Sequence, residues 1–232
     1  MGQAEAELGC RVEEVRQRLA GAYGEPCHVR DLDPVSELVS TILSQNTNDL
    51  NRDVAFGRLR QRFPTWQEVL GAETETVVDA IRPAGLANQK APWIQGALRA
   101  ILDERGELEL DFLGDWPVQE AKAWLSALQG VGPKTAAIVL LFALGRPAFP
   151  VDTHIHRVSR RLGLIGPRVT REKAHDLLEE LVPPQHYYSF HLNVIRHGRQ
   201  ICQARRPRCE ECMLTDLCDY YREVVRPQSY PG

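Results

Sequence analysis

Four cysteines that lie close together near the C-terminus constrain this 232-residue chain more than any other feature of its sequence. They are spaced C-x6-C-x2-C-x5-C and follow a segment with helical periodicity: Cys202, Cys209, Cys212 and Cys218. Four thiolates in one short loop can bind a single metal centre. Zinc, which four thiolates bind tetrahedrally, and an iron–sulfur cluster held by four cysteines both fit this pattern. Disulfide bonds are the alternative interpretation.

The N-terminal sequence and the absence of long apolar runs predict a cytoplasmic, reducing environment. The first ten residues are acidic and lack the apolar core of a secretory signal, and Ala6 stands where a myristoylation signal needs Ser or Thr. No apolar run approaches the roughly 18 residues that a membrane helix needs, so no membrane contact is expected. A reducing compartment favours metal binding over disulfides, and the isolated Cys10 and Cys27 are expected to be ordinary thiols.

Apolar residues recur with helical periodicity along nearly the whole chain, which predicts an all-α fold. Asp33 is expected to cap a helix that starts at Pro34, and apolar stripes predict helices around 8–19 and 93–102. Further helices are expected at about 51–62, 118–128, 133–144, 153–163, 171–181 and 185–198. No alternating pattern predicts a strand, and the acidic stretch Asp103–Asp115 is expected to be a flexible loop.

The sequence LQGVGPKTAA, at residues 128–137, predicts a tight turn between two helices. Gly130, Val131 and Gly132 form the turn, and Pro133 is suited to the first position of the next helix. The glycines leave backbone N–H groups uncovered, and the positive end of the following helix favours an anion, so the turn can bind a phosphate. A plain turn of a helical hairpin is the alternative.

Two charged residues that follow this turn are candidates for a catalytic role in addition to a structural one. Lys134 lies in the first turn of the second helix, where the helix dipole disfavours a cation and so favours the neutral amine that a nucleophile requires. Eighteen residues later, VDTHIHRV places Asp152 at a predicted N-cap. A cap alone would explain Asp152, but capping and catalysis are compatible because a cap fixes the carboxylate in position.

Taken together, LQGVGPKTAA, VDTHIHRV and the four-cysteine spacing resemble the endonuclease III family of helix–hairpin–helix DNA glycosylases. The resemblance covers about residues 30–220 and implies a [4Fe–4S] cluster on the four cysteines, and thus favours iron–sulfur over zinc. It also implies two helical domains. A six-helix barrel with the hairpin would occupy 27–146, and a cluster domain would comprise 1–26 and 147–232. The active site would lie between them.

In activity, the resemblance implies a bifunctional enzyme of base excision repair that acts, as a monomer, on double-stranded DNA containing damaged bases or abasic sites. Lys134 would attack the sugar and form a Schiff base, releasing an oxidised pyrimidine, and β-elimination would cleave the strand. Asp152 would stabilise positive charge on the sugar and accept a proton. The alternatives are a monofunctional mismatch or adenine glycosylase and, in another class, a non-catalytic helix–hairpin–helix DNA-binding protein.

Several other residues match positions that contact DNA in the family. Besides the hairpin turn, they are Gln45, Asn46, Leu86, His154, Arg205, Arg206 and Arg208. Leu86 matches the residue that wedges into the duplex, although an ordinary core leucine is the alternative. The usual pattern LSAQATD reads LSQNTND here, so Asn46 is shorter than the expected glutamine. The three arginines lie in a basic loop between two of the cysteines. In that loop they are suited to phosphates, or alternatively are simply solvated.

The distribution of charge is consistent with a local DNA-binding face. The net charge is −3, but the chain from Asp152 to its end carries 13 Lys and Arg against 10 Asp and Glu. A modestly basic C-terminal third with an acidic remainder fits a local phosphate-binding surface rather than a general polyelectrolyte.

Overall fold

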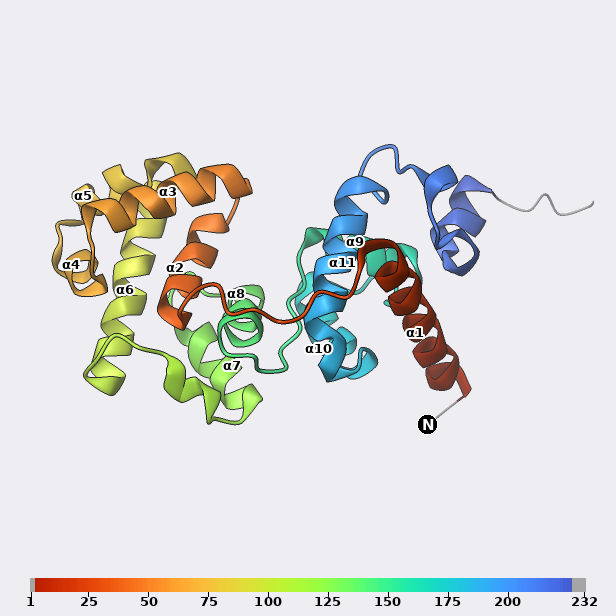
Figure 1. Cartoon of the computed structure of the whole chain (residues 1–232), viewed down its shortest axis with the longest axis horizontal. Helices are drawn as coiled ribbons and strands as arrows, with labels where there is room; N and C mark the ends of the chain where they lie inside the picture. Colours follow the sequence, from red (N-terminus) through yellow and green to blue (C-terminus); the bar gives the residue numbers. More distant parts are fainter. Residues whose placement is uncertain (1–2, 227–232) are drawn as a thin grey trace, which may run out of the picture. The chain divides into compact units, whose positions relative to one another are not determined.

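The structure, a computed structural model, describes residues 3–226, and within that range all assigned elements are helices and no strand occurs. This confirms the predicted all-α fold. The chain divides into two compact units. The central unit spans Val29–Arg146, and the terminal unit holds the chain up to His28 and from Pro147 onward (Figure 1). The assignment of a barrel domain to 27–146 and of a cluster domain to the rest stays a prediction.

The central unit is organised around one buried helix. Its elements are α2 (Pro34–Ser44), α3 (Asp49–Arg62), α4 (Trp66–Gly71), α5 (Thr74–Ile81), the short η1 (Arg82–Ala84), α6 (Ala87–Arg105), η2 (Asp111–Gly114), α7 (Val118–Ala127), α8 (Pro133–Ile138) and the π-helical η3 (Val139–Ala143). Helix α2 packs against α3, α6, α8 and η3, and nearly all of its side chains are buried. Its C-terminus is therefore fixed from several sides, which matters for the residues that follow it.

In the terminal unit, helices from opposite ends of the sequence pack together. Its elements are α1 (Gln3–Tyr23), α9 (Thr153–Arg161), α10 (Arg171–Leu181), η4 (Pro184–His186), α11 (Tyr187–Gln200) and three short turns, η5 (Cys209–Glu211), η6 (Thr215–Leu217) and η7 (Tyr221–Val225). Helix α11 packs on both α1 and α9, and Figure 1 shows α1 and α11 next to each other. The predicted stripe of α1 buries Val12, Val15 and Leu19.

Ion pairs and hydrogen bonds reinforce the contact between α1 and the C-terminal segment. Arg18 donates to the Asp216 carboxylate at 2.6 Å and to the carbonyl of Met213 at 3.1 Å. Tyr23 Oη lies 3.1 Å from His197 Nδ1 in α11. The N-terminal helix thus supports the segment that carries the cysteines.

Local signals set several helix boundaries where the sequence predicts them. Asp33 caps α2 by accepting a hydrogen bond from Ser36 N at 2.9 Å, and Pro34 is the first helical residue. Asp152 caps α9 in the same way, accepting from Ile155 N at 2.7 Å. Both N-cap predictions are confirmed.

Two parts of the central unit differ from the sequence-based expectations. Helices α4 and α5 were not predicted because, at 6 and 8 residues, they are too short to show a repeating apolar stripe. The capping box of Thr65 and Glu68 was an available signal for α4. The expectation of a loop across the whole of Asp103–Asp115 is only partly correct, because helical residues cover both ends of the stretch and leave 106–110 irregular. Helix α6 continues to Arg105, and the stretch buries apolar side chains between its acidic ones, namely Leu110, Phe112 and Leu113.

The two long helices, α1 with 21 residues and α6 with 19, are both rich in charged and polar residues. Accordingly, no helix in residues 3–226 is both long enough and apolar enough to cross a lipid bilayer.

Candidate active site and iron–sulfur centre

The turn between α7 and α8 has the backbone geometry that its glycines predict. Gly130 has φ 80°, and Val131 N donates to the carbonyl of Leu128 at 3.0 Å. A Cβ on Gly130 would lie 2.5 Å from Trp93 Cδ2, so the turn rests directly on the indole ring of α6. Gly130 is therefore required for both its conformation and its close approach to the ring.

A side chain from the end of α2 holds this turn in place. Gln45 follows the last residue of α2, and its Nε2 donates to the carbonyl of Gly130 at 2.8 Å. In the described part of the chain, the backbone amides of Gly132 and Lys134 donate to no backbone carbonyl. These donors, at the start of α8, are free for an anion such as a DNA phosphate.

Lys134 lies in the first turn of α8, directly after the Gly130–Gly132 turn, and its side chain is half-buried. The buried residues Thr135, Ala136 and Ala137 follow it and fix the helix against the central unit. Lys134 belongs to the central unit and Asp152 to the terminal unit.

The position of Asp152 depends on a clamp of buried and half-buried polar side chains on the segment before it. His175 Nδ1 lies 2.9 Å from the carbonyl of Phe149, and His191 Nδ1 lies 3.0 Å from the carbonyl of Pro150. Glu179 accepts a hydrogen bond from Phe149 N at 2.8 Å. The half-buried Asp152 carboxylate is thus held from both sides, by the clamp before it and by its cap on α9. Sequence reasoning missed this clamp because its members lie far apart in the chain.

Arg157 connects α9 to α11 and to the cysteine loop. Its guanidinium donates to the carbonyl of Gly198 at 2.8 Å and to the carbonyl of Cys202 at 3.0 Å. It also lies 3.1 Å from His154 Nδ1. Burial lowers the pKa of His154, although the nearby Asp152 carboxylate opposes that shift. His154 is therefore part of a supporting network rather than an isolated surface residue.

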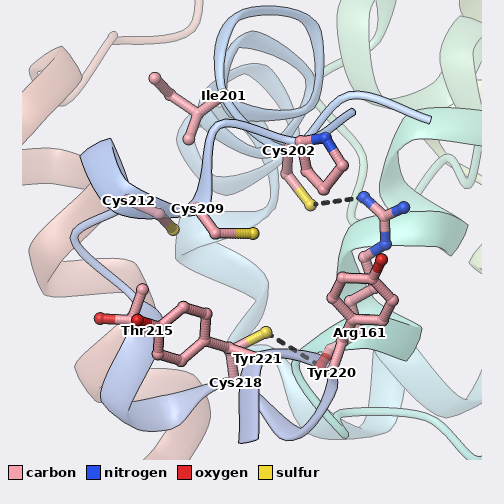
Figure 2. Close-up of a pocket in the computed structure, with 10 residues that line it drawn as sticks. Arg161, Ile201, Cys202, Cys209, Cys212, Thr215, Cys218, Tyr220 and Tyr221 are labelled. Carbon is pink, nitrogen blue, oxygen red and sulfur yellow. Dashed lines mark hydrogen bonds between the residues drawn. The ribbon is translucent and has the colours of Figure 1, made fainter. Parts of the chain in front are cut away.

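The four C-terminal cysteines line one cavity together with Arg161, Ile201, Pro207, Thr215, Tyr220 and Tyr221. Figure 2 shows the sulfur atoms of Cys202, Cys209 and Cys218 directed into the space between them. No three His, Cys, Asp or Glu side chains in residues 3–226 lie close enough together to bind one metal ion. Four cysteines around one common space suit a metal centre with four thiolate ligands.

Arg161 is the main polar residue of this centre, and sequence reasoning did not single it out. Its guanidinium donates to Cys202 Sγ at 3.3 Å, and its backbone carbonyl accepts from the Cys218 thiol at 3.2 Å. It also donates to the carbonyls of Gln203 at 2.7 Å and Ala204 at 3.2 Å. One side chain thus contacts a cysteine sulfur and shapes the start of the basic loop.

Burial raises the pKa of the Cys212 thiol to about 11 in the metal-free protein, and burial likewise raises the pKa of the Cys209 and Cys218 thiols. Metal ligands are thiolates, so loading of the centre releases protons that the folded apoprotein holds firmly. Next to Cys212, the buried imidazole of His197 lies with Nε2 3.6 Å from Sγ, and burial lowers its pKa to about 4. A neutral imidazole therefore lies beside Cys212 in the metal-free protein.

The structure distinguishes among the arginines of the basic loop. Arg205 and Arg206 are exposed, and Arg206 has the left-handed φ of 55°. Arg208 is also exposed, but its Nε donates to Glu211 at 2.7 Å in a bidentate pair. A phosphate would have to compete with Glu211 for Arg208, so Arg206 is the more available partner.

The predicted wedge and gap-filling residues share an unusual backbone conformation. Leu86 has φ 49°, which is uncommon for a bulky residue, and it is 47% exposed. Asn46 has φ 53° and is also exposed. The adjacent Gln45, in contrast, is occupied by its hydrogen bond to Gly130, so of the pair Asn46 is the one with a free side chain.

The fold and these two centres define the class of protein to which the chain is similar. Residues 39–184 match the HhH-GPD superfamily base excision DNA repair protein, and residues 202–218 match the iron–sulfur binding domain of endonuclease III. An endonuclease III of Thermotoga maritima is 35% identical over 91% of this chain and 93% of its own length. The endonuclease III of Escherichia coli K12 is 36% identical over 82% of this chain and 86% of its own length.

Among solved structures, one of a trapped endonuclease III–DNA covalent intermediate has a TM-score of 0.81 and 28% identity, and it covers 94% of this chain and 99% of its own. The chain belongs to the endonuclease III family of the HhH-GPD superfamily. It is a base excision repair DNA glycosylase/lyase that carries a [4Fe–4S] cluster, as the sequence motifs predict.

Removal of one cysteine of the centre tests its assignment. We expect wild-type protein to contain about four iron and four acid-labile sulfide atoms per chain, since the cluster is [4Fe–4S]. Cys209→Ser should lose most of both and unfold at a lower temperature, because the loop would lose the group around which it folds. The matched control is Cys27→Ser, which changes an exposed thiol and should keep full iron content. Stoichiometric zinc in anaerobically purified wild type would contradict a cluster.

Proposed function

We propose that this glycosylase/lyase releases oxidised pyrimidines from duplex DNA, uses Lys134 as nucleophile, and cleaves the strand by β-elimination. The observation that carries the proposal is the position of Lys134. It follows a glycine turn whose free amides suit a phosphate, so an amine stands next to a site for the DNA backbone. A relative of known structure has been trapped as a covalent DNA intermediate, which supports a covalent mechanism for this chain as well.

Lysine is rare in this chain, and that narrows the choice of nucleophile. The sequence contains only four lysines: Lys90, Lys122, Lys134 and Lys173. Lys90 and Lys122 are buried, and Lys173 is an exposed residue of α10 in the terminal unit. Lys134 is the half-buried lysine at the hairpin, so it combines access to a substrate with partial exclusion of water.

In the proposed reaction, Lys134 Nζ forms a bond to sugar C1′ as the bond from C1′ to the base breaks. The base leaves with the bonding electrons, and the amine loses its proton. Opening of the sugar ring gives a Schiff base between Nζ and C1′. Loss of a C2′ proton then expels the 3′ phosphate, which cleaves the strand, and water finally releases the lysine.

Asp152 is proposed to stabilise the positive charge that develops on the sugar as the base leaves, and to accept a proton during attack. A carboxylate placed in advance costs no reorganisation when that charge appears. Its N-cap hydrogen bond and the clamp on Phe149 and Pro150 support such a fixed position. His154 is proposed to support this region through Arg157 and to approach the DNA.

DNA binding is proposed to use both units. In the central unit, the amides of the Gly130–Gly132 turn would bind a phosphate. Leu86 would wedge into the duplex, and Asn46, with Gln45 beneath it, would fill the gap left by the flipped base. In the terminal unit, Arg205, Arg206 and Arg208 would contact phosphates. These roles fit a six-helix barrel at 27–146 and a cluster domain formed by 1–26 and 147–232, with Cys202, Cys209, Cys212 and Cys218 as cluster ligands.

Replacement of Lys134 tests the proposed nucleophile. Lys134→Ala should abolish borohydride trapping and strand scission on a duplex with one thymine glycol while DNA binding is kept, because only the reacting amine is lost. The matched control is Lys173→Ala, which removes an exposed lysine that also lies in the first turn of a helix, α10. It should trap like wild type. Normal trapping by Lys134→Ala would exclude Lys134. Base release without any trapping by wild type would indicate a monofunctional glycosylase.

An amide in place of the Asp152 carboxylate separates catalysis from capping. Asp152→Asn should lower the rate of base release by about 100-fold or more, since the charge that assists the reaction is lost. Stability should change by less than about 0.5 kcal/mol, because asparagine caps helices as well as aspartate. Asp33→Asn makes the same change at the cap of α2 and should leave base release unaltered. A fully active, normally folded Asp152→Asn would show that the carboxylate only caps α9.

The salt dependence of binding tests the basic loop. Arg206→Ala should weaken binding to undamaged duplex and reduce the slope of log K against log salt by about 1, as expected for one lost phosphate contact. Arg168→Ala removes an exposed arginine from a loop of the same unit outside the cysteine segment and serves as the control. Equal slopes for Arg206→Ala and wild type would count against a phosphate contact.

A further inference from the structure

Lys90 is a completely buried lysine, with 0% of its surface exposed, and the reaction proposed above does not use it. It lies on α6, and its Nζ donates to the carbonyl of Leu43 at 2.8 Å and to the carbonyl of Ala84 at 2.8 Å. No carboxylate in the described residues forms an ion pair with it. Burial lowers the pKa of Lys90 to about 8. Burial of an ammonium group without a carboxylate partner costs free energy, and packing alone does not explain why a lysine stands at this position.

The two carbonyls that Lys90 binds belong to the two segments proposed to enter the duplex. Leu43 lies in the last turn of α2, where carbonyls have no partner within the helix, three residues before Asn46. Ala84 ends η1, two residues before Leu86. The positive ammonium group is favoured there because the C-terminal end of α2 carries partial negative charge. Lys90 therefore joins the bases of two loops that are about forty residues apart in the sequence.

Both loops carry a left-handed residue at the position that is exposed. Leu86 has φ 49°, which a bulky residue rarely adopts, and Asn46 has φ 53°, which asparagine tolerates better. Such conformations persist only where the surrounding structure fixes them, and they concentrate at functional sites. A hydrogen bond to the backbone just before each residue is suited to that purpose.

The hairpin turn is connected to the same assembly. Gln45, between Leu43 and Asn46, donates to the carbonyl of Gly130. Three segments proposed to contact DNA are thus linked through backbone carbonyls, two by Lys90 and the third by Gln45. A shift of one segment would be transmitted to the others because the joining groups are buried or half-buried.

We propose that Lys90 is a positioning residue that holds Asn46 and Leu86 in fixed register so that both enter the duplex when a damaged nucleotide is extruded. This rests on the insertion roles proposed above. Lys90 does not touch the reacting atoms. Its loss should therefore impair extrusion of a base from duplex DNA and leave the chemistry at an already accessible sugar unchanged.

The test compares two substrates in the full-length, cluster-containing enzyme. Lys90→Met removes the buried charge and both hydrogen bonds but keeps an unbranched side chain. We expect it to lower base release from a thymine glycol duplex by about 100-fold, the scale that small misplacements cause. Strand scission at an abasic site in single-stranded DNA, where no extrusion is needed, should equal that of wild type. Lys122→Met removes the other buried lysine of the central unit and should affect neither substrate selectively.

A spectroscopic signal tests extrusion directly. The fluorescence of 2-aminopurine placed opposite the lesion should rise when Lys134→Ala enzyme binds, because this variant extrudes without reacting. The rise should be lost in the double variant Lys90→Met/Lys134→Ala. In the same Lys134→Ala background, Leu86→Ala should also abolish the fluorescence rise. Adding Lys90→Met to the Leu86→Ala variant should then change the fluorescence little, since both residues act in one step.

Several outcomes would overturn the proposal. If Lys90→Met loses activity equally on the duplex and on the single-stranded substrate, Lys90 contributes only to general stability. If activity on both substrates is unchanged, Lys90 has no part in extrusion. If Lys90→Met does not fold, Lys90→Gln, which keeps a donor, is judged by the same ratio of duplex to single-strand activity. Absence of scission by wild type on the single-stranded abasic substrate would overturn the proposed lyase chemistry instead. The fluorescence comparison would then decide on Lys90 independently.

Discussion

Hydrogen bonds from buried and half-buried side chains to main-chain carbonyls hold the candidate functional segments of this protein. Irregular segments between helices cannot satisfy their own carbonyl groups, and a buried carbonyl without a donor is destabilising. Here the donors are side chains from elements distant in sequence. Gln45 supports the hairpin turn, His175 and His191 support the segment before Asp152, and Arg157 supports the start of the cysteine loop. These side chains are anchored on helices or at their ends, and their hydrogen bonds fix the conformation of the loops that contain the candidate site residues.

The cysteine loop depends on a second kind of constraint, because it contains only short helical turns. Its cysteines surround a common cavity, and Arg161 fills one side of it with contacts to Cys202 and to the carbonyls of Gln203 and Ala204. A cluster bound there would complete the interior of the loop and fix the exposed backbone from Gln203 to Arg208. In this way a redox-capable group can serve a structural purpose, which is to hold the exposed arginines of this loop in place.

The structure also separates residues that look equivalent in sequence. Gln45 and Asn46 are neighbours of similar chemistry, but one amide is bonded to Gly130 and the other is exposed at a left-handed position. Arg206 and Arg208 lie two residues apart, but only Arg208 is paired with an acidic residue, Glu211. Because their hydrogen-bond partners differ, neighbouring residues differ in how freely they could contact DNA. These partners cannot be deduced from the sequence of residue types.

The sequence by itself determined the all-α class, the caps at Asp33 and Asp152, and the motifs that mark the family, because these depend on residues within a few positions of one another. Periodicity, N-caps and cysteine spacing are local signals. The tertiary structure alone decided that Leu110, Phe112 and Leu113 anchor an acidic stretch, and that Lys90 is buried between the carbonyls of Leu43 and Ala84. Such contacts join residues up to dozens of positions apart, and only the packed chain brings them within hydrogen-bonding distance.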